Sequence, residues 1–190
     1  MLKLKRTPEP APQKPAGPPP TTDHETGLLL LHEFATHLER EVSRGQRYGS
    51  ASALALFDVR VAVTEQNAGS PLPSPARHVA HILQQEARTA DIAARLDLAT
   101  FAVLLINADS KGALSFTERC RTRIGSEPYV RGANGFGLYA RAWAGVADWN
   151  PGIETPEQYV DAAVAALQQT FSGYEAAQSW FRGEGVYLPK

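Results

Sequence analysis

The stretch RTADIAARLDLATFAVLLINADSKGALSFTERCR, Arg88–Arg121, decides the fold prediction. Ile92–Leu96 and Thr100–Ile106 are short apolar runs of strand length, and Asp97-Leu98-Ala99 joins them. Leu114–Ile124 then places its apolar residues at helical spacing. Because so short a connection suits neighbouring antiparallel strands, the stretch predicts a β-hairpin followed by a helix.

Apolar periodicity on both sides of this stretch predicts the remaining elements. The expected elements are a helix at Leu28–Arg44 closed by Gly45, a buried strand within Ala51–Val63, a helix at Ala76–Ala90, a strand at Phe136–Trp149, and a helix at Pro156–Phe171 capped by Thr155. The order is α-β-α-β-β-α-β-α. It implies an α/β (α+β) fold in which helices flank a central mixed or antiparallel sheet.

Proline and charge divide the chain into unlike parts. Seven of the 14 prolines fall in the first twenty residues, which also hold four basic residues and one acidic residue. Dense proline favours an extended, solvated chain. We therefore expect a disordered, proline-rich basic tail at residues 1–22, a mildly acidic domain at 23–171 and a C-terminal appendix at 172–190.

Composition excludes several classes of protein. A single cysteine, Cys120, makes an internal disulfide impossible, which indicates a reducing compartment and a cytoplasmic protein. Apolar runs such as Leu28–Leu31 are far too short for a transmembrane segment. The acidic domain has no block of Lys and Arg, which argues against DNA or RNA as partners.

The histidines and the glycine-rich segment predict no chemistry. His32 and His37 are five residues apart and so do not share a helix face, and His78 and His81 have no third metal ligand nearby. We expect no metal site. The glycine-rich segment 132–137 precedes a strand and is expected to be a turn, since a phosphate-binding loop opens a helix.

Arg88 and Asp91 form the one Arg-x-x-Asp sequence in the chain, at the end of the second predicted helix. Alone, this spacing is typical of a local ion pair on a helix. The residues around this pair support a more specific interpretation.

The whole stretch resembles the GGDEF family of diguanylate cyclase domains. That family carries an RxxD, five residues, a GG(D/E)EF signature on a β-hairpin, an apolar strand and a helix that bears an arginine. Arg88 and Asp91 correspond to the RxxD, Asp97–Phe101 (DLATF) to the signature, and Arg119 to the helix arginine. Asp23–Leu28 also resembles the family's opening D-x-L-T-G-L, so that the resemblance spans roughly residues 23–171.

The resemblance implies that cyclase chemistry is lost. In the family, acidic residues hold two Mg²⁺ ions that activate GTP. Here Asp97 and Leu98 replace the two signature glycines, and Ala99 and Thr100 replace its acidic pair. Arg60 replaces the second aspartate of the first strand, so that Asp58 alone remains of the family's metal-binding residues. We therefore expect no catalytic residue, no metal and no enzyme activity.

The resemblance also implies that the family's regulatory site is retained. There the RxxD binds cyclic di-GMP, so Arg88, Asp91 and Arg119 are the expected ligand contacts. Arg matches the N7 and O6 acceptors of guanine, and a carboxylate suits its N–H donors. The expected function is a cyclic di-GMP receptor that needs no cofactor and acts on a protein partner or a second copy.

Two other functions stay open at this point. One is a nucleotide-independent scaffolding or protein-interaction module that uses the same fold. The other is residual cyclase activity through a relocated acidic set such as Asp58 with Asp97.

Overall fold

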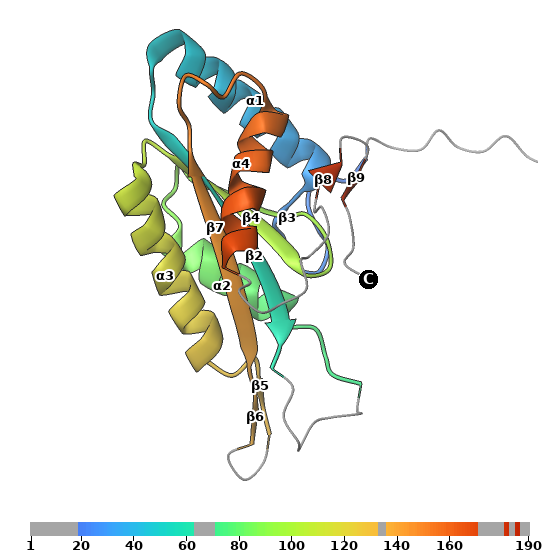
Figure 1. The fold of residues 1–190 in the computed structure, drawn as a ribbon. Helices are drawn as coiled ribbons and strands as arrows, with labels where there is room; N and C mark the ends of the chain where they lie inside the picture. Colours follow the sequence, from blue (N-terminus) through green and yellow to red (C-terminus); the bar gives the residue numbers. More distant parts are fainter. Residues whose placement is uncertain (1–18, 63–70, 133–135, 171–180, 183–184, 187–190) are drawn as a thin grey trace, which may run out of the picture.

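The computed structural model describes residues 19–62, 71–132, 136–170, 181–182 and 185–186. Its centre is a five-stranded sheet with strand order β1-β3-β4-β2-β7 (Figure 1). The strands are β1 (Leu29–Leu30), β2 (Ser52–Val61), β3 (Ile92–Arg95), β4 (Thr100–Ile106) and β7 (Ala140–Asp148). β1 runs parallel to β3, and the other neighbours are antiparallel, so the predicted mixed sheet is confirmed.

Four helices in the described part of the chain cover the two faces of the sheet (Figure 1). They are α1 (Leu31–Tyr48), α2 (Ala76–Glu86), α3 (Ser110–Ser126) and α4 (Pro156–Gln169). One hydrophobic cluster joins the sheet to α2 and α3, and a second joins it to α1 and α4. Strand β2 serves both clusters, because alternate side chains of a strand point to opposite faces. Ala55 and Phe57 belong to the first cluster, and Leu54 and Leu56 belong to the second.

Two short hairpins complete the described elements. β5 (Val130–Arg131) pairs with β6 (Gly137–Leu138), and β8 (Phe181–Arg182) pairs with β9 (Gly185–Val186). The glycine-rich segment therefore lies in a hairpin and opens no helix, as its sequence predicts, although residues 133–135 lie outside the described residues.

The predicted end of the first helix is wrong. We expected Leu28–Arg44 with Gly45 as the stop, whereas α1 runs from Leu31 to Tyr48. Gly45 lies inside the helix and packs against Trp149, where a Cβ would lie 2.4 Å from the ring, so this glycine serves packing and does not end the helix. The stop is Gly49, which adopts the left-handed conformation (φ 63°) and donates its N–H to the Gly45 carbonyl.

The second helix also ends earlier than predicted. α2 stops at Glu86, and Ala87 is already extended with ψ 145°. The reason is the carboxylate of Asp91, which accepts the backbone N–H groups of Arg88 (2.8 Å) and Ile106 (3.1 Å). These two bonds hold residues 88–91 as a turn that leads into β3, where the helical pattern would have continued.

Other predictions concern the ends of the chain. The predicted cap of the last helix is confirmed, because Thr155 and Gln158 form a capping box at the start of α4. Residues 1–18 and most of 171–190 lie outside the described residues, so the boundaries at 22/23 and 171/172 stay predictions. No helix of the described residues has the length and apolar character of a membrane span.

Candidate functional site

Arg88, Asp91 and Arg119 line one cleft of about 420 Å³. The cleft lies where α2 ends, β3 begins, β4 ends and α3 passes over the sheet. A volume of this size is in the range of small-molecule sites. Sequence spacing places Arg88 close to Asp91. The fold brings Arg119 to the same cleft from α3, 28 residues after Asp91.

The Asp91 carboxylate shapes this cleft through backbone contacts. Its two bonds to the Arg88 and Ile106 N–H groups fix the turn and the orientation of both oxygens. A carboxylate has about four acceptor sites, so these two bonds leave capacity for a ligand. Among the described residues, the exposed Arg88 guanidinium has no hydrogen bond or ion pair. The local ion pair that the spacing alone suggests is therefore not formed.

Arg119 is held at the other side of the cleft. Its Nε donates to Glu86 Oε2 at 2.8 Å, and its Nη1 donates to Ser115 Oγ at 3.2 Å. The guanidinium carbon also lies 6.0 Å from the ring centroid of Phe116, a cation–π contact. The side chain is still 51% exposed. Arg119 thus presents part of its guanidinium to solvent.

Glu86 is a residue of this cleft that the sequence analysis missed. It is the last residue of α2, and its second oxygen accepts from Arg123 Nη1 at 3.0 Å. Hydrogen bonds from Arg119 and Arg123 lower the pKa of Glu86, so its carboxyl is ionised near neutral pH. No spacing signal could have found it, because its partners lie 33 and 37 residues away.

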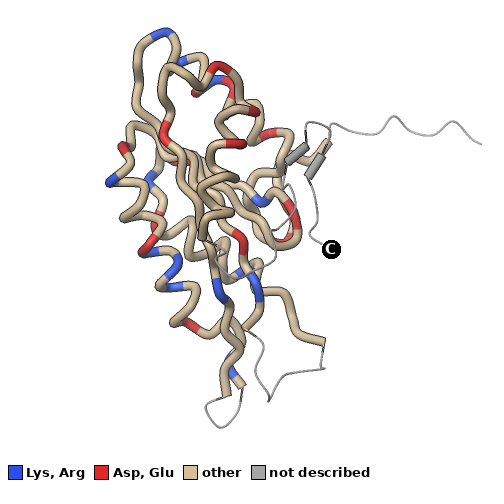
Figure 2. The backbone as a smooth tube through the Cα atoms, in the orientation of Figure 1, with Lys and Arg blue, Asp and Glu red and all other residues tan. Residues whose placement is uncertain are grey.

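The charges that line the cleft are of both signs. Arg88 and Arg119 face the acidic residues Glu86, Asp91 and Asp109. Asp109 is engaged at the N-terminus of α3, where its carboxylate accepts the Gly112 N–H at 2.7 Å. Figure 2 shows the same mixture over the molecule, with basic and acidic residues interspersed along α3.

The second predicted location is the hairpin end of β2, where Asp58 is fully buried. The Arg60 guanidinium donates to both carboxylate oxygens of Asp58. Its Nε lies 3.0 Å from Oδ1, and its Nη2 lies 3.1 Å from Oδ2. Burial raises the pKa of Asp58, and Arg60 opposes this shift. In the β2–β4 register the residue opposite Asp58 is Thr100, which is not a carboxylate. The Arg60 guanidinium is therefore the ion-pair partner of Asp58, and the nearby charge of Asp97 adds to the rise in the pKa of Asp58.

Asp97 has a structural role in the β3–β4 hairpin. Its carboxylate accepts the backbone N–H groups of Ala99 and Thr100, both at 2.7 Å, and the Thr100 hydroxyl at 2.9 Å. These bonds close the turn, whose next residue, Leu98, is 71% exposed. Asp58 accepts hydrogen bonds from Arg60, and Asp97 accepts them from its own turn, so both carboxylates already have donors.

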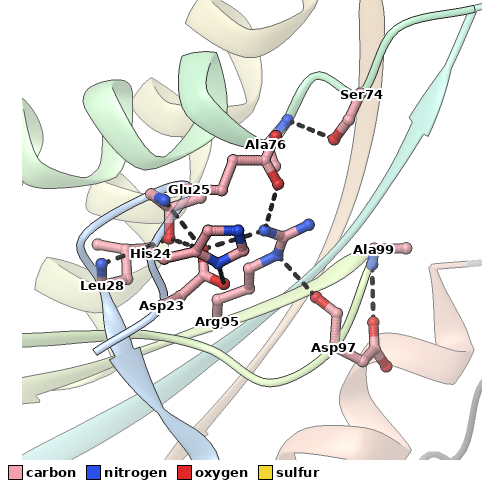
Figure 3. A network of polar contacts seen from close by, with 10 residues as sticks. Asp23, His24, Glu25, Leu28, Ser74, Ala76, Arg95, Asp97 and Ala99 are labelled. Atoms are coloured by element: carbon pink, nitrogen blue, oxygen red, sulfur yellow. Dashed lines mark hydrogen bonds and ion pairs between the residues drawn. The ribbon is translucent and has the colours of Figure 1, made fainter. Parts of the chain in front are cut away.

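Arg95 joins this hairpin to the start of the domain (Figure 3). Its Nη1 contacts Asp23 Oδ1 at 3.0 Å and Glu25 Oε2 at 2.7 Å, and its Nε donates to the Asp97 carbonyl at 3.0 Å. Burial alone would raise the pKa of Asp23, but hydrogen bonds from Thr26 and Arg95 outweigh it and hold that pKa below its ordinary value. The buried Arg95 is a second residue that sequence reasoning missed.

The remaining candidate groups are structural in the part of the chain that the structure describes. No three His, Cys, Asp or Glu residues come together there in a way that could hold a metal ion. Cys120 is buried in the core, and burial raises the pKa of its thiol to about 12. Cys120 is therefore a structural thiol of the core.

Comparison with known proteins bears on both locations. The family model for the diguanylate cyclase GGDEF domain matches residues 76–172, just over half of the chain. No curated protein matches the chain significantly. The matched residues contain the β3–β4 hairpin, every residue that lines the cleft except Ala51, and the helices α2, α3 and α4.

Solved structures share the fold over most of the chain. The GGDEF domain of DgcB from Caulobacter crescentus, solved in complex with c-di-GMP, has a TM-score of 0.71 and 21% identity and covers 85% of this chain and 95% of that one. The FimX GGDEF domain from Pseudomonas aeruginosa has a TM-score of 0.70 and 16% identity over 83% and 97%. The diguanylate cyclase SiaD from Pseudomonas aeruginosa, in complex with its activator SiaC, has a TM-score of 0.68 and 28% identity over 80% and 58%. These similarities confirm the predicted α/β fold.

Proposed function

This chain belongs to the GGDEF family of diguanylate cyclase domains, and we propose that it is a catalytically inactive member that acts as a receptor for cyclic di-GMP. The observation that carries the proposal is the meeting of Arg88, Asp91 and Arg119 in one cleft. These are the three residues that the family's regulatory site requires. In this fold Arg88 and Asp91 come from the turn after α2, and Arg119 comes from α3.

The chemistry of the cleft suits a guanine nucleotide that carries phosphate. The exposed Arg88 guanidinium matches the N7 and O6 acceptors of guanine in a bidentate contact. The unused lone pairs of Asp91 can accept N–H groups of the base. Arg119 presents its outer N–H groups for a phosphate oxygen, since charge-assisted bonds of this kind are among the strongest in proteins.

The hairpin end of the domain supports the loss of catalysis. Two-metal phosphoryl transfer needs carboxylates that are free to hold cations. Here Asp58 is held by Arg60, and Asp97 closes its own turn. At the position opposite Asp58, Thr100 donates its hydroxyl to Asp97.

We further propose a cytoplasmic protein whose output passes through a protein partner or a second copy of the chain. The reducing compartment follows from the single buried Cys120. An exposed cleft that binds one side of a dinucleotide leaves the other side of the ligand free to contact a second protein surface.

Titration calorimetry with cyclic di-GMP tests the proposal. We expect binding heat for the wild type and a loss of affinity of at least about fivefold in Arg88→Ala, because a bidentate arginine contact to guanine contributes about 1–3 kcal/mol. The matched control is Arg77→Ala, an exposed arginine on α2 and outside the cleft, which should bind as the wild type does. No heat at high micromolar ligand, or equal affinity in Arg88→Ala, would contradict the receptor function.

The loss of catalysis has its own test. Purified protein with GTP and Mg²⁺ should form no cyclic di-GMP, and product formation would revive the relocated acidic set of Asp58 and Asp97.

Leu98 favours a second candidate function, a nucleotide-independent protein-interaction module. Its side chain is 71% exposed at the tip of the hairpin, where the family signature has a glycine. In that case a partner would bind Arg88→Ala and the wild type equally well and would bind Leu98→Ser less well.

A further inference from the structure

Glu86 occupies an unusual position for a residue of an anion-binding cleft. Its carboxylate lines the same space as Arg88 and Arg119 and is itself the counterion of Arg119. Only 18% of its side chain is exposed, so its negative charge is incompletely screened by water. An approaching phosphate therefore meets a fixed negative charge beside the arginine that should receive it.

The geometry shows which part of Arg119 the carboxylate uses. Nε donates to Glu86 at 2.8 Å and Nη1 donates to Ser115 at 3.2 Å, so the side of the guanidinium that carries Nε is already in a charge-assisted bond. A ligand that takes the full fork of Arg119 must replace that bond. A ligand that takes the outer edge alone still lies close to the Glu86 charge.

If Arg119 moved away, the Glu86 carboxylate would still have a partner. Glu86 keeps Arg123, whose Nη1 lies 3.0 Å from its other oxygen, and Arg123 itself is also bonded to Glu127 at 2.8 Å. Arg119, in contrast, is half exposed and able to turn outward. The geometry thus allows two arrangements. In the observed one, Arg119 pairs with Glu86; in the other, Arg119 would pair with a bound anion while Glu86 keeps Arg123.

We propose that Glu86 is an internal counterion that competes with the phosphate of the ligand for Arg119 and so lowers the affinity of the cleft for cyclic di-GMP. This inference rests on the proposed function. It assigns Glu86 a regulatory role, because the ligand concentration at which the site fills depends on the strength of the Glu86–Arg119 pair.

Neutralisation of Glu86 tests the inference. In calorimetric titration with cyclic di-GMP, Glu86→Gln should bind about fivefold more tightly than the wild type, the effect of one partly exposed charge-assisted bond. Glu127→Gln is the matched control. It removes the same charge from the same Arg123 cluster, but Glu127 does not line the cleft, so its affinity should equal that of the wild type.

A variant pair shows whether the gain passes through Arg119. In an Arg119→Ala background, Glu86→Gln should bring no gain in affinity, and an equal gain there would contradict competition for Arg119. Thermal unfolding of each variant confirms that it is folded. A crystal structure of the wild-type complex serves as a measurement without substitution: Arg119 Nε should lie beyond hydrogen-bond distance from Glu86.

The outcomes separate this inference from the function on which it rests. Binding by the wild type with equal or weaker binding by Glu86→Gln overturns the inference and leaves the receptor function standing. A complex in which Arg119 keeps its bond to Glu86 does the same. Absence of binding by the wild type and by Glu86→Gln overturns both.

Discussion

The cleft between α2 and α3 and the hairpin end of the sheet both bring arginines to acidic residues, but they place them differently. At the hairpin end, Arg95 is 8% exposed and its N–H groups are used by Asp23, Glu25 and a carbonyl. In the cleft, Arg88 is exposed and its guanidinium has no hydrogen bond or ion pair with the described residues, and Arg119 is half exposed. The same residue types therefore stabilise the fold at one site and stay available for a ligand at the other.

This difference follows from burial. A guanidinium removed from water requires partners for its N–H groups, so the buried arginine becomes a fixed part of the structure. An exposed guanidinium stays hydrated and can exchange water for a phosphate or a base at small cost. The comparison predicts that substitutions at the two sites separate stability from binding, as the following expectations state from the largest effect to the smallest.

Arg95→Met should give the largest loss of stability. Removing one partner of a buried ion pair leaves uncompensated charges, here Asp23 and Glu25, and such changes cost about 3 kcal/mol. Urea unfolding should show this loss, and the exposed Arg77→Ala should change the free energy of unfolding by less than about 0.5 kcal/mol. A loss for Arg95→Met no larger than that of Arg77→Ala would remove the distinction between the two regions.

Asp97→Ala should destabilise the hairpin by about 1–2 kcal/mol, since two backbone N–H groups and the Thr100 hydroxyl lose their acceptor. The affinity for cyclic di-GMP should stay unchanged, because Asp97 does not line the cleft. Equilibrium unfolding and calorimetry measure the two quantities on the same sample. A drop in affinity that accompanies the drop in stability would show that the two regions are coupled.

Arg88→Ala should show the opposite pattern. Its free energy of unfolding should stay within about 0.5 kcal/mol of the wild type, as expected for an exposed side chain, while binding falls. If unfolding reveals a larger loss, Arg88 has a structural partner and the contrast with Arg95 fails.

The pH dependence of stability should have opposite signs at the two sites. The pKa of Glu86 is lowered by its arginines, so its contribution is present above its unfolded pKa and is lost as the pH falls through the folded pKa. The pKa of Asp58 is raised, so its contribution is present at acidic pH and is lost as the pH rises through the folded pKa.

Glu86→Gln should therefore lose most stability, relative to the wild type, at neutral pH and less near pH 3. Asp58→Asn should gain stability relative to the wild type as the pH rises. Urea unfolding at several pH values measures both. Parallel pH profiles for the two variants would contradict the assignment of opposite shifts.

Local patterns predicted much of the fold. The hairpin around Asp97–Ala99 and the capping box at Thr155 depend on neighbours within a few residues, and both are confirmed. The end of α1 was predicted wrongly because Gly45 has the sequence signature of a helix stop, whereas it packs against Trp149, about a hundred residues later. The end of α2 was predicted wrongly because Asp91 bonds to Ile106 across two strands.

The same division applies to the candidate site. Spacing along the chain identified Arg88 with Asp91, and the family resemblance added Arg119. Glu86 and Arg95 were missed because their partners are 33 to 72 residues distant, and a single sequence carries no signal for such pairs.

The sequence by itself determined the order of the elements, the presence of Ala99 and Thr100 at the hairpin, and the presence of Arg88, Asp91 and Arg119. These are properties of residue identity and short-range periodicity. The tertiary structure alone decided which arginines are available. Whether a guanidinium is buried among carboxylates, as Arg95 is, or faces solvent, as Arg88 does, depends on contacts between elements that are distant in the chain. Burial sets the balance between desolvation and ion pairing, and it is a property of the folded chain.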